Sequence, residues 1–169
     1  MQLELEAARW HVINDGVMGG KSRSEVINYQ PRLLFRGQLS LENNGGFASA
    51  LCRFRQGFGG IAGFRLEVRG DGRQYQFRLR ADELPGGIAW RAIFPTDGSQ
   101  QTIDLRLAEF EPVIRGRIVE HAGELRPEDM RLLGFMLADQ QPGSFSLEVQ
   151  SIEALPGPPG KGTAKNSGG

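Results

Sequence analysis

Short runs of alternating apolar and polar residues, separated by glycine-containing turns, constrain the fold of this chain more than any other feature of its sequence. In one run, Phe64, Leu66 and Val68 alternate with Arg65 and Glu67. Alternation places successive side chains on opposite faces of a β-strand, so this run predicts a strand with one buried face. The same pattern recurs in four other segments: 33–41, 75–80, 102–107 and 145–150.

Two further runs, 47–54 and 132–138, are apolar at both odd-numbered and even-numbered positions, which predicts central strands covered on both faces. The 24 glycines and 9 prolines shorten the elements and favour turns over long helices. Only residues 126–130, with a proline near the start and acidic residues after it, predict a short helical turn. We therefore expect an all-β fold of eight to ten short strands in two antiparallel sheets, a sandwich or jelly roll.

The length of 169 residues suits one globular domain, which we place at residues 1–155. Residues 156–169 are rich in proline and glycine and hold no apolar side chain larger than that of Ala164. Such a segment cannot offset the entropy lost on ordering, so we predict a disordered tail.

Composition argues against several classes of function and location. Twenty basic residues balance twenty acidic ones, which disfavours nucleic acid or an anionic membrane as a bulk electrostatic partner. The single Cys52 cannot form an intramolecular disulfide and sits in an apolar run, as a small buried hydrophobe would. We find no segment long enough to span a membrane and no signal or transit peptide pattern, so we expect a cytoplasmic protein.

Catalytic motifs are not found in the sequence. The two histidines, His11 and His121, do not form a pair with metal-ligand spacing. The glycine-rich stretch 57–63 matches neither a nucleotide-binding loop nor a nucleophile elbow, because a strand pattern follows where those motifs need a helix. We expect no enzymatic activity and no cofactor, and we assign no metal site; Ca²⁺ bound among aspartate and backbone oxygens is left open by analogy with the fold alone.

Three loops carry the polar groups that a ligand could meet: 10–24, 42–47 and 70–73. Their backbone donors, amides and carboxylates could bind a partner, and Met18 could add an apolar contact at the tip of the first loop. The alternative is that Asn14 and Asp15 cap turns while Met18 packs inward. Both interpretations remain open at this point.

Arginines outnumber lysines by seventeen to three, and many fall at expected outward-facing strand positions. If the strands were neighbours, these arginines would form a basic sheet face suited to carboxylate, phosphate or sugar hydroxyls. In the alternative, Glu67, Asp104 and Glu148 pair with them across strands on a solvated face. The arginines concerned are Arg36, Arg53, Arg55, Arg65, Arg69, Arg78 and Arg80.

Four separated motifs, in order and over about residues 5–155, resemble the complex I intermediate-associated protein 30 family. They read Trp10 with Asn14-Asp15-Gly16-Val17-Met18-Gly19-Gly20, Ser22 and Ser24; Asn43-Asn44-Gly45-Gly46-Phe47-Ala48-Ser49; Arg69-Gly70-Asp71-Gly72-Arg73-Gln74-Tyr75; and Gly134-Phe135-Met136-Leu137-Ala138-Asp139-Gln140-Gln141-Pro142-Gly143 with Phe145 and Leu147-Glu148. The resemblance implies a galactose-binding-like jelly roll without enzymatic activity. It also implies a chaperone-like factor in assembly of respiratory NADH:ubiquinone oxidoreductase. Because no transit peptide is seen, we expect a bacterial, cytoplasmic member.

The resemblance also implies a set of motif residues, which we take as candidate binding residues: Trp10, Asn14, Asp15, Met18, Gly19, Gly20, Ser22, Asn44, Gly45, Gly46, Phe47, Asp71 and Asp139. We hypothesise that loops 14–24 and 43–47 converge at one end or face of the sandwich and bind a protein partner, such as an unassembled subunit. Many of these polar side chains could instead tie the loops together. Carbohydrate or small-anion binding is the alternative function, and RNA binding is a weaker one.

Overall fold

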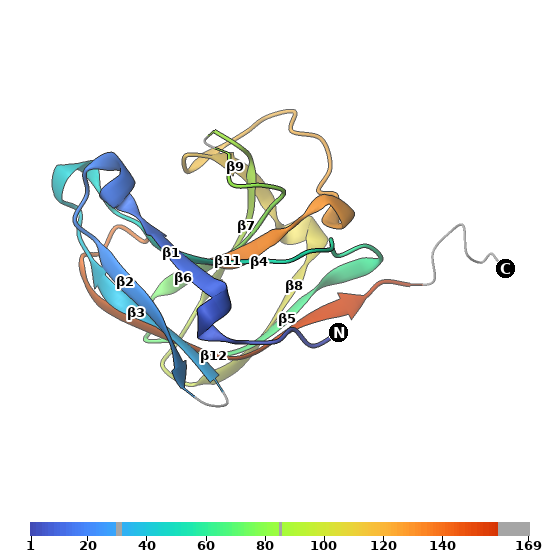
Figure 1. The fold of residues 1–169 in the computed structure, drawn as a ribbon, viewed down its shortest axis with the longest axis horizontal. Coiled ribbons are helices and arrows are strands. Elements are labelled where there is room, and N and C mark those ends of the chain that lie inside the picture. Colours follow the sequence, from blue (N-terminus) through green and yellow to red (C-terminus); the bar gives the residue numbers. More distant parts are fainter. Residues whose placement is uncertain (30–31, 85, 159–169) are drawn as a thin grey trace, which may run out of the picture.

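The computed structural model describes residues 1–29, 32–84 and 86–158, and in these residues the chain forms two antiparallel β-sheets (Figure 1). One sheet has seven strands, which in spatial order are β1 (Trp10–Asn14), β4 (Ala48–Arg53), β11 (Leu132–Leu137), β6 (Gln74–Arg80), β7 (Ala89–Pro95), β9 (Glu111–Ile114) and β10 (Arg117–Ile118). The other has five, namely β2 (Arg23–Tyr29), β3 (Arg32–Leu39), β12 (Gly143–Pro156), β5 (Ile61–Arg69) and β8 (Gln100–Arg106). The predicted all-β, two-sheet sandwich is confirmed.

The helical elements in the described residues are single 3-10 turns, and none is long and apolar enough to cross a membrane. One of them confirms the turn predicted at residues 126–130, with its proline in the first turn. The five are η1 (Ala7–Arg9), η2 (Asp15–Met18), η3 (Glu42–Asn44), η4 (Leu107–Glu109) and η5 (Pro127–Asp129).

The core lies between the two sheets and is built from the alternating apolar positions. On β5, Phe64, Leu66 and Val68 are fully buried, as the sequence pattern predicts. The ring of Phe77 on β6 lies 5.1 Å from that of Phe64 and 5.4 Å from that of Phe135 on β11, measured between centroids. Aromatic rings thus join the two sheets across the core.

The two runs that are apolar at both parities form β4 and β11, which pair with each other near the centre of the seven-stranded sheet, as predicted. The outer face of these strands is also covered. Ser49 is 3% exposed and Leu51 is 6% exposed, although both point away from the core between the sheets. The outer face of this sheet therefore carries a second buried region.

The structure departs from the sequence expectations in three places. It has twelve strands in the described residues, more than the predicted eight to ten. Residues 10–24 were expected to be a loop, but β1 and β2 occupy most of this segment and only 15–22 connect them. On β6 the residues expected to face solvent, Gln76 and Arg78, are 8% and 9% exposed. Of the predicted tail, residues 159–169 lie outside the described part of the chain.

Candidate functional site

The two glycine-containing loops converge at one end of the sandwich, where η2 and η3 lie side by side (Figure 1). Asp15, the first residue of η2, is completely buried. Its Oδ1 accepts from the backbone N–H of Ser22 at 2.8 Å. Its Oδ2 accepts from the Ser22 hydroxyl at 2.5 Å and from the backbone N–H groups of Gly46 at 2.7 Å and Phe47 at 3.2 Å. One carboxylate thereby holds both loops in place.

The hydrogen bonds keep this carboxylate ionised despite its burial. Burial raises the pKa of Asp15, but donation from Ser22, Gly46 and Phe47 outweighs that effect, and the pKa lies below its ordinary value. The glycines beside it are required by space: a Cβ at Gly45 would lie 2.7 Å from Asp15 Oδ2. These contacts support the interpretation that Asp15 ties loops together.

Two other candidate polar side chains, those of Asn14 and Asp71, also make hydrogen bonds within the protein. Asn14 Oδ1 accepts from the Ser24 hydroxyl at 2.7 Å and from the Ser49 backbone N–H at 3.3 Å. Asp71 accepts from the Tyr75 hydroxyl at 3.0 Å and from a backbone N–H of β12 at 2.8 Å. Like Asp15, these side chains fix the relative positions of loops and strands.

Asp139 forms a two-point ion pair with Arg73, in which Nε and Nη2 lie 2.9 and 2.7 Å from the carboxylate oxygens. Burial raises the pKa of Asp139, but the Arg73 guanidinium and a backbone N–H together lower it by more, so the pKa lies below its ordinary value. Trp10 is buried, with its ring stacked on Phe135 at a centroid distance of 6.0 Å. The side chain of Met18 is outside the described part of the structure.

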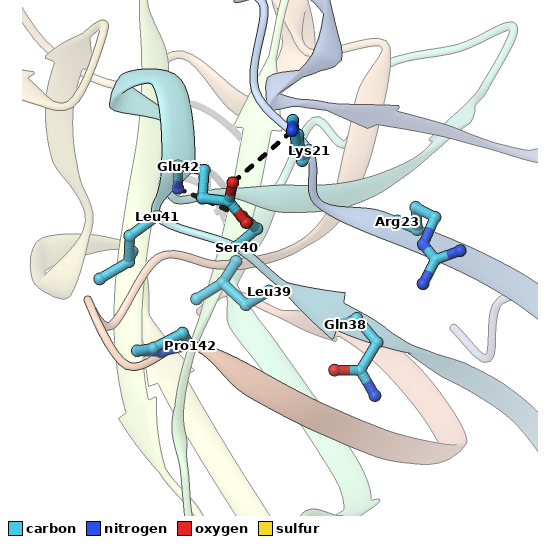
Figure 2. A pocket seen from close by; sticks show the side chains of 8 residues that line it. All are labelled: Lys21, Arg23, Gln38, Leu39, Ser40, Leu41, Glu42 and Pro142. Atoms are coloured by element: carbon cyan, nitrogen blue, oxygen red, sulfur yellow. Dashed lines mark hydrogen bonds and ion pairs between the residues drawn. The ribbon is translucent and has the colours of Figure 1, made fainter.

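Next to the converging loops is a shallow hollow of about 870 Å³ (Figure 2). It is lined by Lys21, Arg23, Gln38, Leu39, Ser40, Leu41, Glu42 and Pro142. Lys21 Nζ lies 3.6 Å from Glu42 Oε1, and both side chains are more than half exposed. Because its charged side chains, Lys21, Arg23 and Glu42, are all exposed to solvent, this hollow has little to hold a ligand.

A different groove, of about 370 Å³, runs over the outer face of the seven-stranded sheet. Its floor is formed by side chains of β4, β11, β6 and β7, and loop 44–47 forms part of its wall. Among the candidate binding residues, Asn44, Gly45, Gly46 and Phe47 therefore line this groove. The full lining is Ile13, Asn44, Gly45, Gly46, Phe47, Ser49, Leu51, Gln76, Arg78, Arg80, Gly86, Gly87, Ala89, Arg91, Val113, Ile114, Arg115, Gly116, Met136, Ala138 and Gln140.

Three arginines lie together on the floor of this groove. Arg78 of β6 is directly opposite Arg91 of β7 in the strand register, and Arg80 is the next residue of β6 on the same face. Arg78 Nη1 donates to Gln76 Oε1 at 2.7 Å and lies 3.3 Å from the sulfur of Met136. Like charges directly opposite each other on adjacent strands destabilise a sheet, so this arrangement has an energetic cost.

The positive charge of the groove floor is poorly compensated. Among the described residues, no aspartate or glutamate lines the groove, and the nearest acid to Arg91 is Glu111, 3.7 Å from its Nε. The Nε–H groups of Arg80 and Arg91 are buried and have no hydrogen-bond acceptor within the described residues. Burial, with smaller contributions from the charges of Arg80 and Arg91, lowers the pKa of Arg78 to about 10. An anion bound in the groove would compensate the charge of the arginines, supply acceptors for the Nε–H groups and stabilise the charged form of Arg78.

The predicted basic face is thus divided between the two sheets. Arg36 and Arg65 lie on the five-stranded sheet, where they pair with Glu25 at 3.0 Å and Asp104 at 2.7 Å. The pair between Arg65 and Asp104 is solvated and joins two neighbouring strands, which is the alternative that the sequence analysis gave for this acid. Arg78 and Arg80 line the groove, together with Arg91, which was not among the arginines expected there.

If this buried charge serves ligand binding, it should not contribute to stability. We expect the double variant Gln76→Leu/Arg78→Met, which replaces both hydrogen-bond partners by apolar side chains, to raise the free energy of unfolding by about 1 to 3 kcal/mol. Urea denaturation monitored by tryptophan fluorescence measures the change. Arg65→Met is the matched control on the other sheet and should leave the transition midpoint almost unchanged. A clear loss of stability in the double variant would contradict this view of the groove.

The fold is a two-sheet jelly roll, and solved carbohydrate-binding modules have a similar fold. A family 11 module of the cellulase Lic26A-Cel5E of Clostridium thermocellum aligns with a TM-score of 0.69 at 12% identity, covering 92% of this chain and 95% of that one. A family 11 module from Clostridium thermocellum in complex with a β-1,3-1,4-mixed-linked tetrasaccharide aligns with a TM-score of 0.69 at 14% identity, covering 93% of this chain and 96% of that one. A family 30 carbohydrate-binding module aligns with a TM-score of 0.53 at 12% identity, covering 86% of this chain and 87% of that one.

The family assignment comes from the sequence. The family model for Complex I intermediate-associated protein 30 matches residues 2–149. The chain belongs to that family, which confirms the resemblance carried by the loop motifs.

Proposed function

We propose that this chain is a non-catalytic binding protein that holds a protein partner in the groove of its seven-stranded sheet. The observation that carries the proposal is the groove floor, where the buried guanidinium of Arg78 has no acidic partner among the described residues. A family named for association with an intermediate of complex I makes a subunit on its way to assembly a fitting partner.

The geometry favours the groove over the loop end as the binding surface. The carboxylates of Asp15, Asp71 and Asp139 are occupied by hydrogen bonds within the protein, so they have little left to offer a partner. In the groove, the Nε–H groups of Arg80 and Arg91 have no acceptor among the described residues, and they lie beside half-buried apolar groups that include Ile13 and Met136. Arginine and methionine, unlike most charged residues, are enriched at the centre of protein interfaces.

A photo-crosslinking experiment tests this proposal in the native host. Benzoylphenylalanine is introduced at Ile93, which is 47% exposed and lies on the same face of β7 as Arg91, and, as a matched control, at Tyr29, which is 53% exposed on β2 of the other sheet. We expect a reproducible crosslinked protein from the Ile93 position only. Equal capture from both positions, or none from Ile93, would refute the groove as the partner site.

Carbohydrate binding is the second candidate function, and the structural similarity to carbohydrate-binding modules favours it. Sugar rings bind proteins largely by stacking on exposed aromatic side chains. Among the groove residues, Phe47 is the one aromatic side chain within the described part of the chain. A glycan array with neutral and acidic oligosaccharides decides between the two functions, and binding of a neutral glucan would favour the second.

A further inference from the structure

We propose that Arg78, Arg80 and Arg91 form an anion-binding site that takes the carboxylates of an acidic segment of the partner protein. This inference rests on the proposed function and names the chemistry of the segment that the groove holds. The arrangement of the three guanidinium groups carries it.

The first support is the distribution of charge. The chain contains as many acidic as basic residues, yet the described lining of the groove contains four arginines, the fourth being Arg115, and no acidic side chain. On the five-stranded sheet, Arg32, Arg36 and Arg65 have acidic partners within 3.3 Å, namely Glu148, Glu25 and Asp104. In the groove, Arg78 and Arg80 have no acidic partner within 4 Å among the described residues and Arg91 has only Glu111 at 3.7 Å, so their charge is open to an external anion.

The second support is the state of the individual N–H groups. An arginine side chain offers five donors in a planar fork that matches a carboxylate. Arg80 uses Nη2 on the backbone carbonyl of Leu84 at 2.8 Å, and Arg91 faces Glu111 only at 3.7 Å. The Nε–H groups of both are buried without an acceptor among the described residues. Buried donors without acceptors are costly, and an anion in the groove would supply the acceptors for both.

The third support is the register of the strands. Because Arg78 and Arg91 are directly paired across β6 and β7, their side chains leave the sheet close together. Arg80 is two residues along β6 on the same face. A segment with several closely spaced carboxylates could contact all three guanidinium groups at once, whereas a single carboxylate could not neutralise them.

The apolar part of the lining favours a peptide over an acidic saccharide. Ile13, Phe47 and Met136 are half-buried around the arginines and offer contact area for apolar side chains. An acidic peptide segment can carry both carboxylates and apolar groups. An oligosaccharide of uronic acids carries the charge but would leave this apolar area without a matching surface.

The test is fluorescence polarisation with a labelled tetraglutamate peptide, a tetraglutamine peptide of equal length and an oligogalacturonate as probes. We expect the full-length protein to bind tetraglutamate, to bind tetraglutamine at least about tenfold more weakly, and to lose affinity as salt is raised. Arg91→Gln and Arg78→Met should each weaken tetraglutamate binding at least about tenfold. Arg65→Gln, which removes the same charge from the opposite sheet, should bind like the unaltered protein.

Each result decides the inference. Equal binding of tetraglutamate and tetraglutamine, or equal losses in Arg91→Gln and Arg65→Gln, would overturn it. Binding of oligogalacturonate without tetraglutamate would overturn it in favour of an acidic glycan. Melting temperatures of all variants establish whether they are folded. If Arg78→Met does not fold, the binding result for Arg91→Gln decides the outcome.

Failure of the inference is distinguishable from failure of the proposed function. If the photo-crosslinker at Ile93 captures a partner equally well in the Arg91→Gln background, the groove is the partner site but its arginines do not bind carboxylates. If Ile93 captures nothing while tetraglutamate binds through the arginines, the anion site exists and the proposed function is wrong.

Discussion

Replacing Asp15 by alanine is expected to lower the free energy of unfolding by at least about 3 kcal/mol, because two loops lose their common acceptor. The Asp15 carboxylate accepts from the backbone N–H groups of Ser22, Gly46 and Phe47 and from the Ser22 hydroxyl. Those donors would remain buried without a partner. Urea denaturation at neutral pH measures the loss, and an unchanged transition midpoint would show that the loops hold together without this residue.

Asp97→Ala is the matched control for Asp15→Ala. Asp97 also accepts from a backbone N–H and a hydroxyl, both of Ser99, but it is exposed and the bonds stay within one turn. Its removal should change the midpoint much less. A loss as large as that of Asp15→Ala would mean that burial and loop-tying do not explain the effect.

The pH dependence of the Asp15 contribution follows from the direction of its pKa shift. Its pKa is lowered in the folded state relative to an ordinary carboxyl of about 3.9. The stabilisation is therefore fully present above that value and is lost as the pH falls through the lower, folded-state pKa. The Asp15→Asn variant should lack this part of the acid dependence.

Replacing Phe77 by alanine is expected to cost about 3 to 5 kcal/mol, because its ring lies at the centre of the core and leaves a cavity there. Phe77 is fully buried on β6, and its ring contacts those of Phe64, Phe110 and Phe135. Phe54→Ala is the matched control, since Phe54 is only half-buried at the edge of the core. Thermal and urea denaturation measure both, and equal losses would contradict a core centred on Phe77.

The fold could be predicted where the chemistry is local. Alternation along 64–68 marks β5 because each residue's own type indicates its face. The sequence did not mark β1, β2, β7, β9 and β10. In β1 the residues His11 and Val12 are exposed, and in β7 the charged Arg91 interrupts an otherwise apolar run. Short edge and central strands of this kind are defined by their neighbours, which a single sequence does not reveal.

The candidate site could be predicted only in part for the same reason. Convergence of loops 14–24 and 43–47 was expected from their motifs, and the structure places them together. The inward direction of the Asp15 carboxylate depends on backbone donors 31 residues away. The groove depends on which strands are neighbours: Arg78 meets Arg91 through the pairing of β6 with β7, and no spacing in the sequence indicates that those two charges are left without acids.

The central claim is that ligand binding takes place on the arginine floor of the groove and not at the loop end. Nuclear magnetic resonance of the arginine side-chain Nε–H groups tests it most directly, with the tetraglutamate peptide as the ligand. We expect the signals of Arg78, Arg80 and Arg91 to move on titration while those of Arg36 and Arg65 stay in place. Shifts confined to the backbone of residues 15–24, with the groove arginines unchanged, would contradict it.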